Sequence, residues 1–264
     1  REVLSRAGSG QRTLWEMVLR HELQHCETMR QTMALAGLLP KGEPPRVTLG
    51  AGAGWVEVPA GTFAMGADGV AFSYDNERPR HDVTLGAFAI AHLPVTNASW
   101  MHFSEGGGYV RREWWSREGW AWKEEYDITH HPSVEAGPPD GPVCHVSWFE
   151  ADAFARAHDA RLPTEEEWER AATWSHGDGD EHAAGALGAV GSVWEWTSSP
   201  FGGYPGFQAH PYREYSEVFF GDRHRVLRGG SWATDPLIAT ATFRNWDLPQ
   251  RRQIFAGVRL ARDL

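Results

Sequence analysis

The sequence predicts an α+β protein in two parts, a helical segment followed by a larger domain of short strands and helices. Residues 13–38 carry apolar side chains at three- and four-residue spacing, which indicates one long helix. From Trp55 onward, short alternating segments separated by Gly, Pro and Asn residues indicate strands and turns. The 14 tryptophans, 29 glycines and 16 prolines are typical of a loop-rich domain pinned by large aromatic side chains. We place the boundary between residues 45 and 46.

The predicted first helix contains His21-Glu22-Leu23-Gln24-His25, which places two imidazoles on one helical face. Four apolar residues share that face by their spacing: Leu14, Val18, Met29 and Met33. We therefore expect both histidines to lie on the stripe that turns toward a core. An imidazole pair of this kind commonly binds a metal ion. The structural alternative is a pair of core histidines hydrogen-bonded to backbone or carboxylate groups.

This helix cannot bury its apolar stripe without a packing partner. Gly37 and the proline-rich residues 40–45 are expected to end the helix and to form a linker. The partner is expected to be a set of helices upstream of Arg1, in which case the chain is N-terminally incomplete, or the domain that follows.

The second part is predicted to mix strands with helices. Residues 55–58 and 83–90 alternate between apolar and other side chains, which predicts strands. Two capping boxes predict helices, one opened by Ser147 and running to about His158, the other opened by Thr164.

Composition narrows the function classes. The 264 residues carry a net charge of −10 without long basic runs, which argues against nucleic acid or an anionic membrane as a partner. No apolar run approaches the roughly 18 residues of a membrane span, and residues 1–11 lack the apolar core of a signal peptide. The two cysteines, Cys26 and Cys144, fit a reducing compartment. We expect a cytoplasmic enzyme.

His-Glu-x-x-His is also the signature of zinc proteases, in which Glu22 would act as the general base. That class requires a third ligand at a characteristic spacing downstream. After His25 the next histidine is His81, so the sequence disfavours a protease.

Residues 55–66 resemble the opening of the formylglycine-generating-enzyme fold, a variant of the C-type-lectin-like architecture. Further matches follow in chain order at residues 94–97, 142–148, 161–169, 193–197, 228–232 and 257–259. Most of these residues are expected to be structural, as turn glycines, core tryptophans and buried Arg–Glu pairs. The copper-using members carry a cysteine just after the final Gly-x-Arg, where this chain has Leu260, so thiolate–copper chemistry is disfavoured.

A His-x-x-x-His-x-Glu helix joined to such a domain resembles the iron(II)-dependent sulfoxide synthases of ergothioneine biosynthesis. The resemblance implies that residues 1–45 are the last part of a DinB-like metal-binding helical bundle and that residues 46–264 are the catalytic domain. Members use Fe(II) and O2 to join a thiol to the imidazole C2 of hercynine. Their iron is held by three histidines, of which His21 and His25 match two. The third comes from an earlier helix that this chain does not contain.

The resemblance also assigns roles around the metal. Gln24 matches a residue that hydrogen-bonds near the hercynine imidazole, although a solvent-facing glutamine is the alternative. Tyr212 and Tyr215 match two tyrosines spaced by three, the first a proton donor during oxygen activation and the second a wall of the hercynine pocket. Tyrosines that only pack are the alternative.

Residues 243–253 resemble the actinobacterial-type enzymes, which take γ-glutamylcysteine. In this interpretation Asp247 binds the ammonium of the thiol substrate and Arg251 binds a carboxylate. Trp246 offers an aromatic face to the trimethylammonium group of hercynine, and Asn245 a donor to its carboxylate. An ordinary surface pair of Asp247 and Arg251 is the alternative.

The sequence therefore predicts a cytoplasmic non-haem iron oxidoreductase that forms a C–S bond and a sulfoxide from hercynine, γ-glutamylcysteine and O2. The same scaffold with cysteine or a selenium donor, and a non-catalytic lectin-like binding module, remain alternatives. The region between residues 174 and 193 looks shorter than in the family. The arginines of the front domain that clamp the thiol substrate are absent together with the missing segment. We expect this chain alone to bind iron weakly and to need the absent bundle for full activity.

Overall fold

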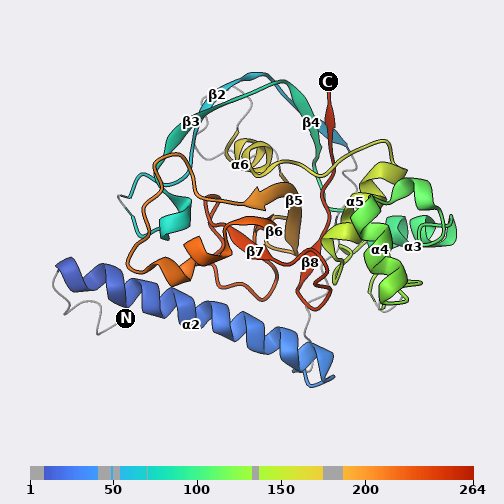
Figure 1. The fold of residues 1–264 in the computed structure, drawn as a ribbon, viewed down its shortest axis with the longest axis horizontal. Helices are drawn as coiled ribbons and strands as arrows, with labels where there is room; N and C mark the ends of the chain where they lie inside the picture. The colour runs from blue at the N-terminus through green and yellow to red at the C-terminus, as the bar shows by residue number, and fades with distance from the viewer. Residues whose placement is uncertain (1–8, 41–48, 50–53, 70, 133–136, 175–186) are drawn as a thin grey trace.

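The computed structural model describes residues 9–40, 49, 54–69, 71–132, 137–174 and 187–264. One long helix, α2 (Ser9–Leu35), lies along one side of a domain made of small sheets, short helices and long loops (Figure 1). The helix confirms the expectation for this segment, with its ends a few residues earlier than predicted. The linker expected at residues 40–45 lies almost wholly outside the described residues.

The central sheet positions the candidate site. It has four strands in the order β7 (Asn245–Asp247), β6 (Gly221–Arg228), β5 (Trp194–Phe201) and β8 (Ala256–Gly257). Neighbours are antiparallel except for the parallel pair of β5 and β8. β5 is buried along most of its length, as expected for a strand with a neighbour on each side. β7 is an edge strand, so its three side chains are available to line a site.

Two smaller sheets complete the domain. One has the order β1 (Trp55–Val58), β4 (Phe88–Ala91) and β9 (Ala261–Asp263), and the other pairs β2 (Gly61–Met65) with β3 (His81–Leu85). The strand predicted at residues 55–58 is confirmed. The single strand predicted at residues 83–90 is wrong, because the chain leaves one sheet after Leu85 and enters another at Phe88.

The two predicted capping boxes are confirmed at helices α5 (Trp148–Ala157) and α6 (Glu165–Thr173), whose caps are Ser147 and Thr164. The structure adds α3 (Asn97–Glu105) and α4 (Arg117–Glu125), which the sequence analysis missed. Both are short and begin with a single capping hydroxyl rather than a box, which is a weaker signal. Short 3₁₀ turns lie at Asp75–Glu77, Arg112–Trp114, Arg213–Tyr215 and Glu217–Phe219.

Buried Arg–Glu pairs hold the motif segments together, as the sequence predicted. Arg259 and Glu195 are both fully buried and joined by two hydrogen bonds of 2.6 Å, while the indole of Trp168 donates to the same carboxylate at 2.6 Å. Arg228 with Glu169 and Arg244 with Glu165 are further buried pairs between segments, whereas Arg161 pairs with Glu167 inside the segment of residues 161–169. Each of these glutamates is paired with an arginine that holds the fold together, so we do not consider them as candidate catalytic groups.

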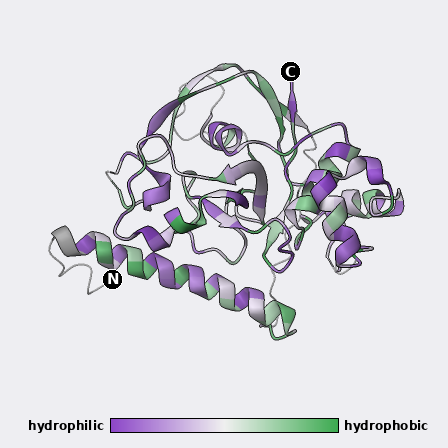
Figure 2. Cartoon of the chain, in the orientation of Figure 1, coloured by the Kyte–Doolittle hydropathy of each residue, from purple (hydrophilic) through white to green (hydrophobic). Residues whose placement is uncertain are grey.

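The orientation of α2 differs from the prediction. Leu14, Val18 and Met29 are 51%, 42% and 58% exposed, whereas Met17 and Glu27 are buried against the domain. Periodicity marks a stripe but cannot say which of two adjacent stripes faces the neighbour. Here polar contacts to the domain decide the rotation of α2. Figure 2 shows the helix as hydrophilic in the middle and apolar toward its ends.

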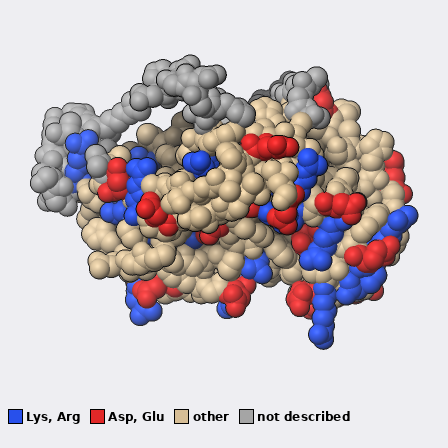
Figure 3. Space-filling model, turned by 90° about the horizontal axis from the view of Figure 1, so that it is seen from above, with Lys and Arg blue, Asp and Glu red and all other residues tan. Residues whose placement is uncertain are grey.

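Two surface properties bear on function. On the face shown in Figure 3, acidic and basic side chains are interspersed rather than gathered into fields of one sign. Among the described residues, no helix is both long enough and apolar enough to cross a membrane.

The pH dependence of stability can be predicted from His131, which is 5% exposed and hydrogen-bonded through Nε2 to the Cys144 carbonyl at 2.8 Å. Burial lowers the pKa of His131 to about 4. Because the unfolded chain takes up a proton near pH 6.5, it binds more protons than the folded chain between these values. The contribution of neutral His131 to the free energy of unfolding is therefore fully present above pH 6.5 and is lost as the pH falls toward 4. At pH 5 the loss is about 2 kcal/mol.

Urea unfolding at several pH values tests this expectation. The variant His131→Gln should flatten the decline in unfolding free energy between pH 7 and pH 5, whereas His130→Gln, at an exposed neighbour, should keep the wild-type slope. Equal slopes in all three proteins would contradict it.

Candidate metal and substrate site

The two histidines of α2 lie side by side, as predicted. Their ring centroids are 4.5 Å apart with 53° between the ring planes. His21 is half-buried near Tyr215, with 6.1 Å between ring centroids, and His25 is exposed. Burial and the neighbouring imidazole of His25 lower the pKa of His21. His21 is thus biased toward the neutral form, which is the form that binds metal ions.

The histidines lie at the boundary between the face of α2 that packs on the domain and the face that is exposed. At about 100° per residue, Gln24 and Glu27 fall on one side of His21, whereas Val18 and Met29 fall on the other. One side of this boundary is packed on the domain and the other is exposed. A metal ion held here would therefore face the domain and still have an open side.

The donor set fits a metal ion in part. Two neutral imidazole nitrogens suit iron, zinc, copper or nickel, and a site with few protein ligands keeps positions for substrates. Within the described ranges, no group of three or more His, Cys, Asp or Glu side chains is placed to hold one ion. If a metal ion binds here, the described residues would supply at most two of its ligands.

Gln24 connects α2 to the domain directly beside the histidines. Its amide nitrogen donates to the hydroxyl of Tyr74 at 2.9 Å and to the hydroxyl of Tyr215 at 3.2 Å. The two phenol rings are stacked, with centroids 4.5 Å apart and only 6° between the planes. Burial raises the pKa of both phenols, so they remain protonated near neutral pH. The predicted solvent-facing alternative for Gln24 is excluded by this geometry.

Tyr74 was missed by the sequence analysis. It lies in a run of consecutive polar residues, 73–77, which are all buried. Buried polar runs are rare enough to suggest a structural or functional role. That burial cannot be inferred from the sequence, because the same residues are typical of an exposed turn.

The loop that carries the two predicted tyrosines is fixed by Asp75. Its carboxylate accepts hydrogen bonds from the backbone N–H of His210 at 3.2 Å and from the Ser216 hydroxyl at 2.7 Å, at the two ends of the loop. Tyr215 is buried beside His21, in agreement with its predicted place. Tyr212 is 42% exposed and, among the described residues, has no hydrogen bond or ring contact to the histidine pair.

The residues of β7 lie next to this cluster. Trp246 stacks on Phe201, with centroids 4.2 Å apart, and presents an edge to Tyr215 at 5.9 Å. Asn245 lines a pocket of about 90 Å³ together with Gln24. The structure thus brings together the predicted residues His21, Gln24, Tyr215, Trp246 and Asn245.

Asp247 and Arg251 form a loose pair at the edge of the site, with 3.7 Å between Arg251 Nε and Asp247 Oδ2. Burial raises the pKa of Asp247, and the nearby guanidinium opposes that shift in part. Asp247 ends strand β7 and the Arg251 side chain is 44% exposed, so an ordinary surface pair remains the alternative to a substrate-binding pair.

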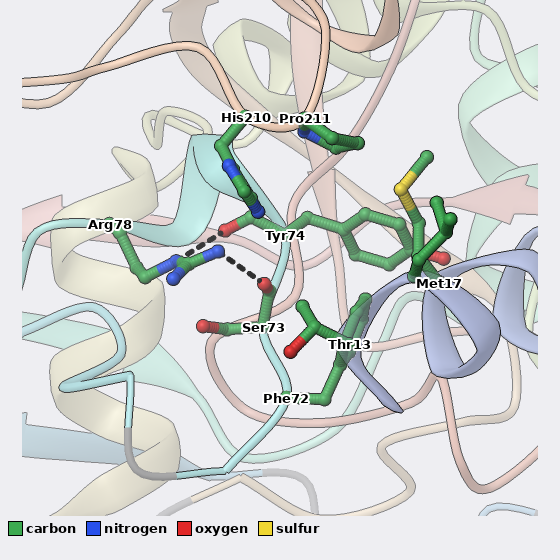
Figure 4. A pocket seen from close by; sticks show the side chains of 9 residues that line it. Thr13, Met17, Phe72, Ser73, Tyr74, Arg78, His210 and Pro211 are labelled. Carbon is green, nitrogen blue, oxygen red and sulfur yellow. Dashed lines mark hydrogen bonds between the residues drawn. The ribbon is translucent and has the colours of Figure 1, made fainter. Parts of the chain in front are cut away.

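A second pocket of about 230 Å³ adjoins the cluster on the other side of Tyr74. It is lined by Thr13, Leu14, Met17, Phe72, Ser73, Tyr74, Arg78, His210 and Pro211. Figure 4 shows Arg78 donating to the backbone oxygens of Ser73 and Tyr74. This guanidinium is committed to the loop, and the hydrogen bond between Tyr74 and Gln24 joins the linings of the two pockets.

The fold and the helix-borne histidines define a sulfatase-modifying-factor-like domain with a helix packed on it. The family model for the sulfatase-modifying factor enzyme 1-like domain matches residues 41–186 and 177–264. The two matches meet at the segment that was predicted to be shortened, most of which lies outside the described residues. Among solved structures, PvdO from Pseudomonas aeruginosa is similar with a TM-score of 0.53 and 20% identity, over 80% of this chain and 94% of that one.

Comparison with named relatives defines the family of this chain more closely. A hercynine oxygenase of Mycobacterium tuberculosis is 40% identical over 97% of this chain and 72% of its own length. The one of Mycolicibacterium smegmatis is 42% identical over 94% of this chain and 71% of its own length. A formylglycine-generating enzyme of Mycobacterium tuberculosis is 28% identical over 59% of this chain. The chain belongs to the hercynine oxygenase family and is an enzyme.

The contribution of Tyr74 can be measured with Tyr74→Phe, which keeps the stacked ring and removes the hydroxyl that Gln24 reaches. We expect the free energy of unfolding to fall by about 1 kcal/mol, the usual value of one hydrogen bond. Tyr126→Phe, at a tyrosine that is 60% exposed, is the matched control and should change little. Equal urea midpoints for both variants would show that the hydroxyl of Tyr74 does not hold α2.

Proposed function

We propose that this enzyme uses Fe(II) and O2 to join γ-glutamylcysteine to hercynine, with a sulfoxide as product, in ergothioneine biosynthesis. The observation that carries the proposal is the placement of His21 beside Tyr215, with Gln24 hydrogen-bonded to Tyr215 and Trp246 packed against it, in a chain of this family. The names of the relatives support the hercynine and oxygen parts, and a fungal relative from Neurospora crassa, 42% identical over 29% of this chain, is named ergothioneine biosynthesis protein 1.

His21 and His25 would hold the iron. When bound, the iron supplies sites for the substrates and for activating O2, which neither side chain can do alone. We propose that the third ligand is a histidine of a preceding helical segment. The exposed stripe of Leu14, Val18 and Met29 is where such a segment would pack. In this proposal residues 1–45 complete a DinB-like bundle and residues 46–264 form the catalytic domain.

Hercynine would lie between α2 and β7. With its amide nitrogen held by two phenols, Gln24 keeps its carbonyl oxygen as an acceptor for an imidazole N–H. Asn245 can donate from its side-chain amide to the carboxylate of hercynine. Trp246 is half-buried and stacks on Phe201, and the part of its ring that the neighbouring side chains leave uncovered would contact the trimethylammonium group.

The thiol substrate would be bound by the loose Asp247–Arg251 pair. A gap of 3.7 Å between their nearest charged atoms leaves both able to accept new partners. The ammonium of γ-glutamylcysteine would favour the ionised form of Asp247, whose pKa burial raises. Arg251 is exposed enough to turn toward a carboxylate and bind it with two hydrogen bonds.

Tyr212 is proposed as the proton donor at the oxygen of the product. Because Asp75 fixes both ends of its loop, a rotation of the Tyr212 side chain, rather than a loop movement, would bring the phenol toward the substrates. Removing the hydroxyl should divert the enzyme from C–S bond formation toward dioxygenation of the thiol, while O2 is still consumed. We place the enzyme in the cytoplasm, because its two cysteines, Cys26 and Cys144, are both free thiols, as is usual in a reducing compartment.

Oxygen uptake by the Fe(II)-loaded full-length protein tests the proposal. We expect uptake to require hercynine and γ-glutamylcysteine together, with the sulfoxide formed in step with O2. His21→Ala and His25→Ala should lower the rate by at least about 10²-fold, because each removes a metal ligand. Glu22→Gln is the control, since a zinc-protease mechanism would lose its general base there, whereas an oxygenase should keep most of its activity.

Other outcomes select the alternatives. Faster turnover with cysteine or a selenium donor would change the thiol substrate and keep the scaffold. No iron uptake and no oxygen consumption in the full-length protein would reject the enzyme mechanism and favour a lectin-like binding module.

A further inference from the structure

Glu27 is a buried carboxylate on the metal helix, two residues after His25. Its side chain is 6% exposed and accepts three hydrogen bonds. The indole N–H of Trp194 and the hydroxyl of Ser231 donate to Oε1, both at 2.7 Å, and the hydroxyl of Thr234 donates to Oε2 at 2.6 Å. In the described part of the chain this carboxylate has no cationic partner.

The three donors come from two rigid segments of the domain. Trp194 begins β5, and the other two lie in the turn after β6. That turn is braced internally, because Ser231 N–H donates to Thr234 Oγ1 at 2.8 Å and Ala233 N–H donates to Ser231 Oγ at 3.2 Å. The donors are therefore fixed before the helix packs on them.

A buried charge is an expensive way to attach a helix. Desolvation of a carboxylate is offset here by short hydrogen bonds from neutral groups and by no ion pair. An apolar side chain would pack at lower cost but without direction. Three convergent donors instead fix where the carboxylate lies, and thereby the rotation and height of α2.

Rotation of α2 matters because the histidines share its rigid backbone. With a helix radius of about 5–6 Å including side chains, a rotation of 30° moves an imidazole by about 3 Å. Such a shift would break the hydrogen bonds of Gln24 to the two phenols and displace His21 from Tyr215. Displacements of about 1 Å already reduce catalysis strongly.

We propose that Glu27 is a positioning residue that fixes the rotation of α2, and so places the His21–His25 pair and Gln24 against the substrate wall. This inference rests on the proposed function. It assigns a second task to the segment of residues 228–232, whose glycines and tryptophan were expected to be structural, because Ser231 binds the metal helix.

Co(II) binding to the full-length protein provides the test, with affinity read from the d–d absorption bands and the KM for hercynine measured separately on Fe(II)-loaded protein. Glu27→Ala should weaken Co(II) binding about 10- to 100-fold, the usual effect of losing a group that orients metal ligands. It should also raise the KM for hercynine more than it lowers kcat. Thr234→Val, which removes one donor and keeps the carboxylate, should give a smaller loss in the same direction.

Two controls separate positioning from stability. Glu16→Gln changes a carboxylate on the same helix whose side chain is 27% exposed and ion-paired with Arg20 of that helix, and Phe154→Leu loosens the core at a ring of α5 stacked on Trp100. Both should keep wild-type Co(II) affinity. If Glu27→Ala does not fold, Thr234→Val decides. Wild-type affinity and KM in the folded variants would overturn the inference alone, whereas a wild-type protein that binds no Co(II) would overturn the proposed function as well.

Discussion

The contact between α2 and the domain is the interaction on which the candidate site depends. Gln24 bridges two stacked phenols, and Glu27 is held by three donors from β5 and the turn after β6. These polar contacts, together with the packing of Met17 and Leu23 on the core, hold this face of the helix inward. As a result the two imidazoles lie at the boundary between the packed and the exposed face of α2, with a wall of aromatic and amide groups on one side and an exposed apolar stripe on the other.

The domain can provide such a firm wall because its motif segments are cross-linked internally. The fully buried pair of Arg259 and Glu195 joins the last strands to β5, and Trp168 donates to the same carboxylate. Breaking a pair of this kind leaves an uncompensated charge, so the network tolerates little change. The proposed chemistry lies at the rim, where β7, the loop fixed by Asp75 and α2 meet.

The sequence allowed the fold class, the long helix, both capping boxes and the Arg–Glu pairs to be predicted, because each depends on local spacing or on ordered motifs. The histidine pair and Gln24 were predictable for the same reason. The rotation of α2 was not, since Leu14 and Val18 have the periodicity of a buried stripe and yet are exposed. Tyr74 and Asp75 could not be recognised, and Glu27 was seen only as the last residue of the His-x-x-x-His-x-Glu motif, because the contacts of all three join segments that are far apart in the sequence.

The central claim is that His21 and His25 hold an iron ion beside the hercynine pocket. The most direct test is the electron paramagnetic resonance spectrum of the nitric oxide adduct of the Fe(II)-loaded full-length protein, recorded with and without hercynine. The account predicts about one iron per chain, a spectrum that changes when hercynine is added, and loss of the signal in His25→Ala. A wild-type signal that persists in His25→Ala, or one that hercynine leaves unchanged, would contradict it.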